Sequence, residues 1–179
     1  MRYVCFVFLV IGLLSCQEDS ILNLDSPTTA TGRQWVDVDP LLVPHFINFE
    51  EAAFERGFDI DLSITGITAN IEEIQESDIA GQCTYGVHRL SPKEILIDET
   101  FWNQASELYR EYIIFHELGH CHLLRDHNDQ CTSLGIWESI MRSGTVRGCR
   151  DSYNNRTRAA YLDELFAPNN LQKTKSPIR

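Results

Sequence analysis

The sequence contains no long uninterrupted run of apolar residues, no cluster of basic residues and no internal repeat. Its longest apolar stretch falls short of the roughly 18 residues that a membrane-crossing helix needs, which excludes a bundle of membrane-spanning helices. Lys and Arg number 15 against 26 Asp and Glu, and this net charge of −11 argues against a nucleic-acid partner. The 10 glycines and 6 prolines exclude collagen-like and low-complexity chains, and the missing repeat excludes solenoids and propellers.

What the chain does have is the composition of one globular domain. Of its 179 residues, 43% are apolar and 23% are charged, as in folded proteins. The hydrophobic pattern predicts an α+β domain, because segments with helical and strand periods follow one another without regular alternation. The expected elements are a helix from Asp39 to Gly57, a strand from Ile60 to Thr65, a strand through Cys83 and Val87 with its hairpin partner Lys93–Asp98, a long helix from Ser106 to Leu124 and a short helix from Arg156 to Phe166.

Residues 1–15 predict a signal peptide that is removed. After Arg2, residues 3–14 are mostly apolar, a length that suits a signal-peptide core. The stretch ends in the letters LLSC and resembles a bacterial lipoprotein signal, which implies cleavage before Cys16 and acylation of its thiol. Acyl chains on Cys16 would anchor the protein without spanning the membrane. The alternative is a plain secretory signal cut near Ser15.

The segments that flank the domain are polar. Residues 16–32 read as the lipidated cysteine and a flexible tether, and residues 168–179 as a flexible tail. The letters QED that follow Cys16 resemble the surface-export signal of lipoproteins in Bacteroidetes-type bacteria. That resemblance implies an extracytoplasmic protein at the outer membrane or cell surface, which contacts the membrane only through its lipid. The domain itself is expected to occupy residues 33–167.

Four cysteines remain once the signal peptide is removed and Cys16 is lipidated, and outside the cytoplasm an even number favours disulfides. These are Cys83, Cys121, Cys131 and Cys149. Four cysteines allow three pairings, among which the sequence does not choose. We favour Cys131–Cys149 together with Cys83–Cys121. The first pair would close a loop of about 18 residues, worth roughly 3 kcal/mol by the loop-entropy argument.

The strongest chemical signal is the segment HELGH in the long predicted helix. His116 and His120 are four residues apart and therefore project from the same helical face, where both imidazoles can bind one zinc ion. Glu117 is rotated off that line and is expected to take a proton from the water that zinc activates, rather than to bind the metal. A catalytic zinc site needs a third protein ligand and keeps the fourth position for water.

The candidates for the third ligand are three residues that follow the HELGH segment: His122, Asp126 and His127. His122 points to another side of the helix and is a poor ligand. On a straight helix His127 would lie roughly 10.5 Å further along the axis than His120, too far to share a metal. The helix must therefore end after about Leu123 for His127 to fold back. Asp126 is the remaining candidate.

With these motifs the chain resembles the metzincin family of zinc endopeptidases. Metzincins continue the helix motif through a glycine turn to a third histidine, followed by a methionine-containing turn beneath the metal. Ser139-Ile140-Met141 resembles that turn, which implies that Met141 forms a hydrophobic floor under the zinc. The implied fold is a small mixed sheet packed on the active-site helix, with a short C-terminal part that contains the Met-turn and a final helix.

The chain departs from the metzincin pattern at two places. The position of the third ligand in metzincins is occupied by Asp126 in this chain, and the position of their turn glycine is occupied by Leu123. We favour a turn that is longer by one residue and delivers His127, with Asp126 as the alternative ligand. Many metzincins carry a tyrosine two residues after the methionine, where this chain has Ser143. Tyr153 or Arg142 are candidates to replace its function.

The resemblance implies a zinc-dependent endopeptidase that acts as a monomer on peptide or protein substrates. It also implies that the strand around Cys83–His88 receives an extended peptide. The first alternative is a surface lipoprotein whose weakly active or vestigial zinc site binds a protein or glycan partner. The second uses Glu138 as a thermolysin-like third ligand. His45 and His88 are expected to be ordinary core or surface residues.

Overall fold

A three-stranded mixed sheet forms one layer of the protein. The computed structural model describes residues 32–75, 79–86, 92–144 and 148–168, and their fold is α+β, as the sequence predicts. The predicted signal peptide, Cys16 and the residues from 169 onward lie outside the described residues. The elements are α1 (Val43–Phe54), β1 (Ile67–Glu72), β2 (Gly81–Tyr85), β3 (Lys93–Asp98), α2 (Glu99–Gln104), α3 (Glu107–Cys121) and α4 (Arg158–Leu165).

The central strand of the sheet is β3, which pairs parallel with β1 and antiparallel with β2. The pairing confirms the predicted hairpin of β2 and β3, although Val87 lies outside the described residues. Ile95 and Ile97 are fully buried two residues apart, because alternate side chains of a strand share one face. That face packs against the helices. Because β3 is central, β2 is an edge strand of the sheet.

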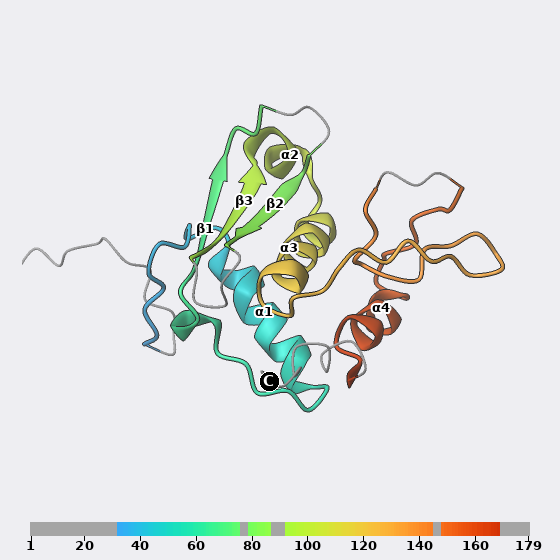
Figure 1. Ribbon diagram of the computed structural model, residues 1–179, viewed down its shortest axis with the longest axis horizontal. Helices are drawn as coiled ribbons and strands as arrows, with labels where there is room; N and C mark the ends of the chain where they lie inside the picture. The colour runs from blue at the N-terminus through green and yellow to red at the C-terminus, as the bar shows by residue number, and fades with distance from the viewer. Residues whose placement is uncertain (1–31, 76–78, 87–91, 145–147, 169–179) are drawn as a thin grey trace, which may run out of the picture.

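The helix α3 is the centre of the domain. Figure 1 shows it between the sheet and the C-terminal segment that carries α4, with α1 below the sheet. Phe115 on α3 contacts Phe49 on α1 edge to face, with ring centroids 5.1 Å apart. Phe49 in turn contacts Phe166, which follows α4, at 5.0 Å. A helix covered on several sides must be apolar on several sides, which explains the run of buried residues Tyr112, Ile113, Ile114 and Phe115.

The predicted strand from Ile60 to Thr65 is wrong. Leu62–Ile64 forms a 3₁₀ turn, whose N-cap Asp61 accepts a hydrogen bond from the backbone N–H of Ser63. Leu62 is buried but Ile64 is 81% exposed, so the alternating isoleucines do not share a core-facing side. The chain turns at Gly66, whose φ is +70°, and the first strand begins only at Ile67.

The helix limits also differ from the predictions. Asp39 does not cap a helix that starts at Pro40; its carboxylate accepts from the N–H of Leu41 in a turn, and α1 begins at Val43. Trp102 belongs to the separate short helix α2, and α3 ends at Cys121. No helix in the described part of the chain has both the length and the apolar character needed to cross a membrane.

Both favoured disulfides are present. Cys83 on β2 is bonded to Cys121 at the end of α3, with their Cα atoms 5.7 Å apart. Cys131 is bonded to Cys149 in the C-terminal region, with their Cα atoms 6.3 Å apart. Disulfides of this kind are typical of proteins outside the cytoplasm. The first bridge ties the edge of the sheet to the helix that carries the HELGH segment.

Removal of the disulfide Cys131–Cys149, by replacing both cysteines with serine, is expected to lower the free energy of unfolding by about 3 kcal/mol. Without the bridge, which closes a loop across a sequence separation of 18, the unfolded chain has more conformational entropy, and this stabilises the unfolded state. Denaturant titration of the parent and of the double variant measures this difference. Equal midpoints in the two proteins would contradict the prediction.

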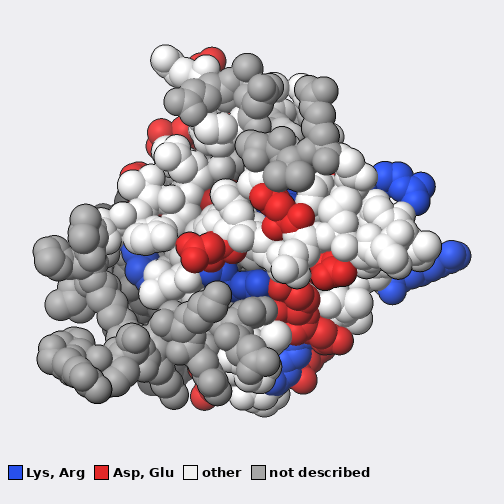
Figure 2. Space-filling view, turned by 45° about the vertical axis from the view of Figure 1, so that its right-hand side comes forward, with Lys and Arg blue, Asp and Glu red and all other residues white. Residues whose placement is uncertain are grey.

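The face of the molecule drawn in Figure 2 carries charged side chains of both signs. Figure 2 shows acidic groups spread over the visible face, with basic side chains between and beside them. Among the described residues on this face there is no large basic patch of the kind that nucleic-acid binding requires.

Candidate functional site

Three imidazoles meet at one point beside α3. The Nε2 atom of His120 lies 3.0 Å from Nε2 of His116 and 3.2 Å from Nε2 of His127. Within the described ranges these three form the group of His, Cys, Asp and Glu side chains close enough to hold a metal ion. Asp126, the alternative third ligand, is exposed and is not part of this group.

The other ring nitrogen of two of these histidines faces a backbone carbonyl. Nδ1 of His116 lies 2.8 Å from the oxygen of Ile140, and Nδ1 of His120 lies 2.6 Å from the oxygen of Arg125. A carbonyl only accepts hydrogen bonds, so each Nδ1 carries the proton and each neutral ring directs a lone pair from Nε2. This is how protein structure fixes the tautomer of a metal-binding histidine.

Converging lone pairs repel one another unless a cation lies between them. Tetrahedral zinc with Zn–N bonds of about 2.0–2.1 Å separates two ligand nitrogens by about 3.3–3.4 Å, close to the spacing found here. Burial lowers the pKa of His116 to about 3, since the charged imidazole would lose its hydration. It also lowers the pKa of His120. Both rings are therefore neutral near pH 7, and the donor set fits a zinc ion.

The turn after α3 brings His127 back to the other two ligands. The N–H of Leu123 donates to the carbonyl of Leu118, and the N–H of Arg125 donates to the carbonyl of Gly119. Between them Leu124 has a φ of +55°, a left-handed conformation that residues other than glycine rarely adopt. The reversal therefore occurs at Leu124 and not at Leu123, which holds the place of the usual turn glycine.

A single carboxylate, that of Glu164 on α4, joins the segments around the three histidines. Its oxygens accept from Nη2 of Arg125 at 2.5 Å, from Oγ of Ser139 at 2.6 Å and from Nδ2 of Asn128 at 3.4 Å. Arg125 is the residue whose carbonyl orients His120, and its buried guanidinium needs this partner. The sequence analysis missed Glu164, because nothing near it in the sequence marks it as part of a site.

Met141 packs against α3 at Gly119, the residue before His120. Its side chain is fully buried, its N–H donates to Oγ of Ser139, and its carbonyl accepts from the N–H of Asn128, next to His127. A Cβ atom at Gly119 would collide with Sδ of Met141, so only glycine allows this close approach. The glycine of the HELGH segment therefore has a packing reason.

Glu117 lies against the edge strand β2. The space next to it is made by Gly81, where a Cβ would lie 3.0 Å from Oε1 of Glu117. Burial raises the pKa of the Glu117 carboxyl to about 8, although the backbone N–H of Cys83 donates to it and works in the opposite direction. A carboxyl group with a pKa near neutrality can both accept and release a proton.

A cavity of about 410 Å³ contains the site. Its lining includes two of the histidines, Glu117, the first residues of β2 and an apolar wall from α2 and α3: Ile79, Ala80, Gly81, Gln82, Phe101, Tyr109, Tyr112, Ile113, His116, Glu117, His127, Arg142, Ser143 and Gly144. Substrate atoms in this cavity would reach both the metal ligands and Glu117.

The hydroxyl groups of Ser143, which stands in the place of the usual tyrosine, and of the replacement candidate Tyr153 are both engaged. The Ser143 hydroxyl donates to the carboxylate of Asp129, whose oxygens lie 2.8 and 3.0 Å from Oγ. Tyr153 donates to Glu111 at 2.5 Å and does not line the cavity. Arg142, by contrast, does line it.

The remaining sequence candidates lie elsewhere. Glu138, the thermolysin-like alternative, is exposed and is not part of the histidine group. His122 is half-buried and contacts the ring of Phe49 at 6.5 Å. His88 lies outside the described residues.

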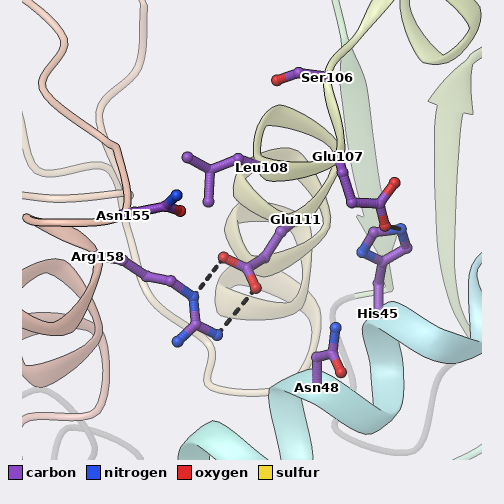
Figure 3. A pocket seen from close by; sticks show the side chains of 8 residues that line it. All are labelled: His45, Asn48, Ser106, Glu107, Leu108, Glu111, Asn155 and Arg158. Carbon is purple, nitrogen blue, oxygen red and sulfur yellow. Dashed lines mark hydrogen bonds and ion pairs between the residues drawn. The ribbon is translucent and has the colours of Figure 1, made fainter.

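A second cavity, of about 450 Å³, lies against a different part of α3. Figure 3 shows His45 next to Glu107, and Arg158 paired with both oxygens of Glu111. His45 is buried, and its Nδ1 has no hydrogen-bond partner among the residues that the structure describes. None of the three converging histidines lines this cavity.

Comparisons of this chain with models of protein families, with curated proteins and with solved structures find no match.

The carboxylate of Glu164 can be tested apart from the ligands. Replacing Glu164 with alanine is expected to weaken zinc binding by about 10–100-fold, the usual effect of removing a group that orients metal ligands. Asp163→Asn is the matched control, because Asp163 is the neighbouring acid on α4 and its partner is Arg56 at the surface. Competition with a chromophoric chelator measures both affinities. Equal affinities in the two variants would contradict the prediction.

Proposed function

We propose that this protein is a zinc-dependent peptidase that uses His116, His120 and His127 as metal ligands and Glu117 as general base. The observation that carries the proposal is the convergence of three imidazoles: Nε2 of His120 lies 3.0 Å from Nε2 of His116 and 3.2 Å from Nε2 of His127. Backbone carbonyls set the tautomers of His116 and His120. A zinc ion in this position supplies a Lewis acid that polarises a carbonyl group and makes water more acidic.

The residues of the chain have distinct roles in the proposed reaction. Glu117, which is buried next to His116 and lines the cavity, takes a proton from the attacking water and passes it to the leaving amine. Strand β2, which stands at the edge of the described sheet and whose Cys83 N–H donates to Glu117, receives an extended peptide next to Glu117. The carbonyls of Ile140 and Arg125 hold the imidazoles of His116 and His120 in the orientation that binds metal.

The metzincin-like assignment remains part of this proposal. It is supported by the order of a helix with two of the proposed ligands, a tight turn to His127 and the buried Met141, which packs against Gly119 of that helix. The two disulfides support secretion, and we propose that the lipid on Cys16 holds the protein at the cell surface.

The second candidate function is a surface lipoprotein with a vestigial zinc site that binds a protein or glycan partner. The observation that favours it is the engagement of Ser143 and Tyr153 by carboxylates, which leaves neither hydroxyl available to stabilise a transition state.

One experiment separates the two functions. The chain from residue 17 onward is purified with its disulfides formed, its zinc content is measured by elemental analysis, and it is incubated with a peptide library. One zinc per chain, with cleavage that stops on chelation and returns with added zinc, supports the peptidase. One zinc per chain without cleavage of any substrate supports the binding protein. No zinc contradicts the peptidase and favours a binding protein whose helix motif is vestigial.

A further inference from the structure

The cavity that holds the candidate site contains a single permanent positive charge. Among its described lining residues Arg142 is the only Lys or Arg, and Glu117 is the only carboxylate. Arg142 directly follows Met141, whose backbone is fixed by Ser139 and Asn128, so the start of its side chain is held relative to the histidines. The charge of this cavity is therefore unlike the net charge of the chain, which is −11.

The guanidinium of Arg142 is held from two sides. Its Nε and Nη2 atoms donate to the two oxygens of Asp151, at 2.6 and 2.7 Å. Its Cζ atom lies 5.7 Å from the centroid of the Tyr112 ring, within the range of a cation–π contact. Both contacts restrict the side chain before any ligand arrives, which lowers the entropy that binding costs.

The third guanidinium nitrogen of Arg142, Nη1, has no hydrogen-bond partner among the described residues. It lies 3.5 Å from where a Cβ at Gly144 would stand. Gly144 also lines the cavity, so Nη1 is placed at its wall. An arginine has five N–H donors, and a planar group that already holds one carboxylate with two nitrogens can donate to a second acceptor with the third.

The charge of Arg142 is only partly compensated by Asp151. The Arg142 side chain is 16% exposed, whereas that of Asp151 is 54% exposed and is screened by water. The Tyr112 ring next to the guanidinium belongs to an aromatic part of the cavity wall, where Tyr109 stacks on Tyr112 at 5.7 Å and Phe101 packs against Tyr109. A hydrogen bond from a cation to an anion is strengthened next to such low-dielectric walls.

We infer that the site selects peptides that carry a carboxylate near the scissile bond, and that Nη1 of Arg142 binds this group. The inference rests on the proposed peptidase function. The carboxylate is either the side chain of an aspartate or glutamate or the free C-terminus of the peptide, since both offer the same two oxygens. The acidic chain would by its net charge alone favour basic peptides, so the inference predicts the opposite preference.

Matched peptides test this substrate class. A set of fluorogenic peptides is prepared in which each position beside the scissile bond holds Glu, Gln or Lys in turn. Each of these peptides is made twice, once with a C-terminal acid and once with a C-terminal amide. The parent is expected to cleave the carboxylate-bearing member about tenfold or more faster than its neutral partner, in kcat/KM. Preference for Glu identifies a side-chain carboxylate, and preference for the free acid identifies the C-terminus.

Three variants assign the preference to Arg142. Arg142→Gln is expected to bring the ratio to about one, and Arg142→Glu to favour the Lys peptide. Arg156→Gln is the control, because it removes one exposed positive charge that does not line the cavity. Thermal unfolding and zinc content show whether each variant is folded and loaded with metal. A parent that cleaves all members at equal rates overturns the inference.

The inference and the proposed function fail in different ways. Binding of the same peptides to Glu117→Gln is measured by calorimetry, so that the preference is observed without cleavage. If the parent cleaves nothing but the carboxylate preference in Kd is present and is lost in Arg142→Gln, the peptidase fails and the recognition stands. If peptides bind without preference, or none binds, the recognition by Arg142 is wrong.

Discussion

Replacing Glu117 with glutamine is expected to leave one zinc per chain and to lower the rate of peptide cleavage by about 10²–10⁴-fold. Glutamine has nearly the same volume, so it keeps the packing against Gly81 on β2. It cannot take up a proton, so the attacking water is no longer deprotonated. The folded structure is expected to tolerate the change, because burial already disfavours the charged form of Glu117.

The measurement compares initial rates on a peptide that the parent cleaves, with zinc content determined on the same samples. Glu107→Gln is the matched control, since Glu107 lies on the same helix and is 75% exposed. It does not line the cavity that contains His116 and Glu117. The control is expected to keep the parent rate. A Glu117→Gln variant that cleaves the peptide at the parent rate would contradict the proposed mechanism.

The second large effect concerns the third ligand. Replacing His127 with alanine is expected to abolish stoichiometric zinc binding, because two imidazoles on one helical turn do not complete a tetrahedral site. Asp126→Ala is expected to keep the metal, since the Asp126 carboxylate lies outside the group formed by the three histidines. The two substitutions change adjacent exposed residues, so each serves as the control for the other.

Elemental analysis and the shift of thermal unfolding with added zinc measure the outcome. Zinc should raise the unfolding temperature of the parent and of Asp126→Ala, because a ligand that binds only the folded state stabilises it. It should leave His127→Ala unchanged. Zinc lost only from Asp126→Ala would instead make aspartate the third ligand.

The sequence predicts those features that depend on short-range periodicity. Two histidines four residues apart on a helix meet because of helical geometry, and the alternation around Ile95 and Ile97 predicts the β2–β3 hairpin in the same way. The sequence limits the four cysteines to three pairings without choosing among them, and the favoured pairing is the one that the structure shows. The coarse α+β class needs no more than these patterns.

What the sequence does not predict depends on long-range contacts or on local energetics that are finely balanced. The alternation from Ile60 to Thr65 is that of a strand, but the Asp61 cap and Gly66 stabilise a 3₁₀ turn instead. The left-handed residue Leu124 has a side chain that gives no sign of this conformation. Glu164 joins the histidine segments from 36 or more residues away in the sequence, a distance over which no pattern carries information.

The position of Glu164 has a consequence for the biosynthesis of the protein. A ribosome completes all three histidines and Met141 before it reaches α4, so every proposed ligand exists before the carboxylate that holds their segments together. A chain that ends before residue 164, through a premature stop codon or proteolysis, keeps its complete HELGH segment and loses the partner of the buried Arg125. Completion of the proposed metal site therefore waits for the last helix of the described chain.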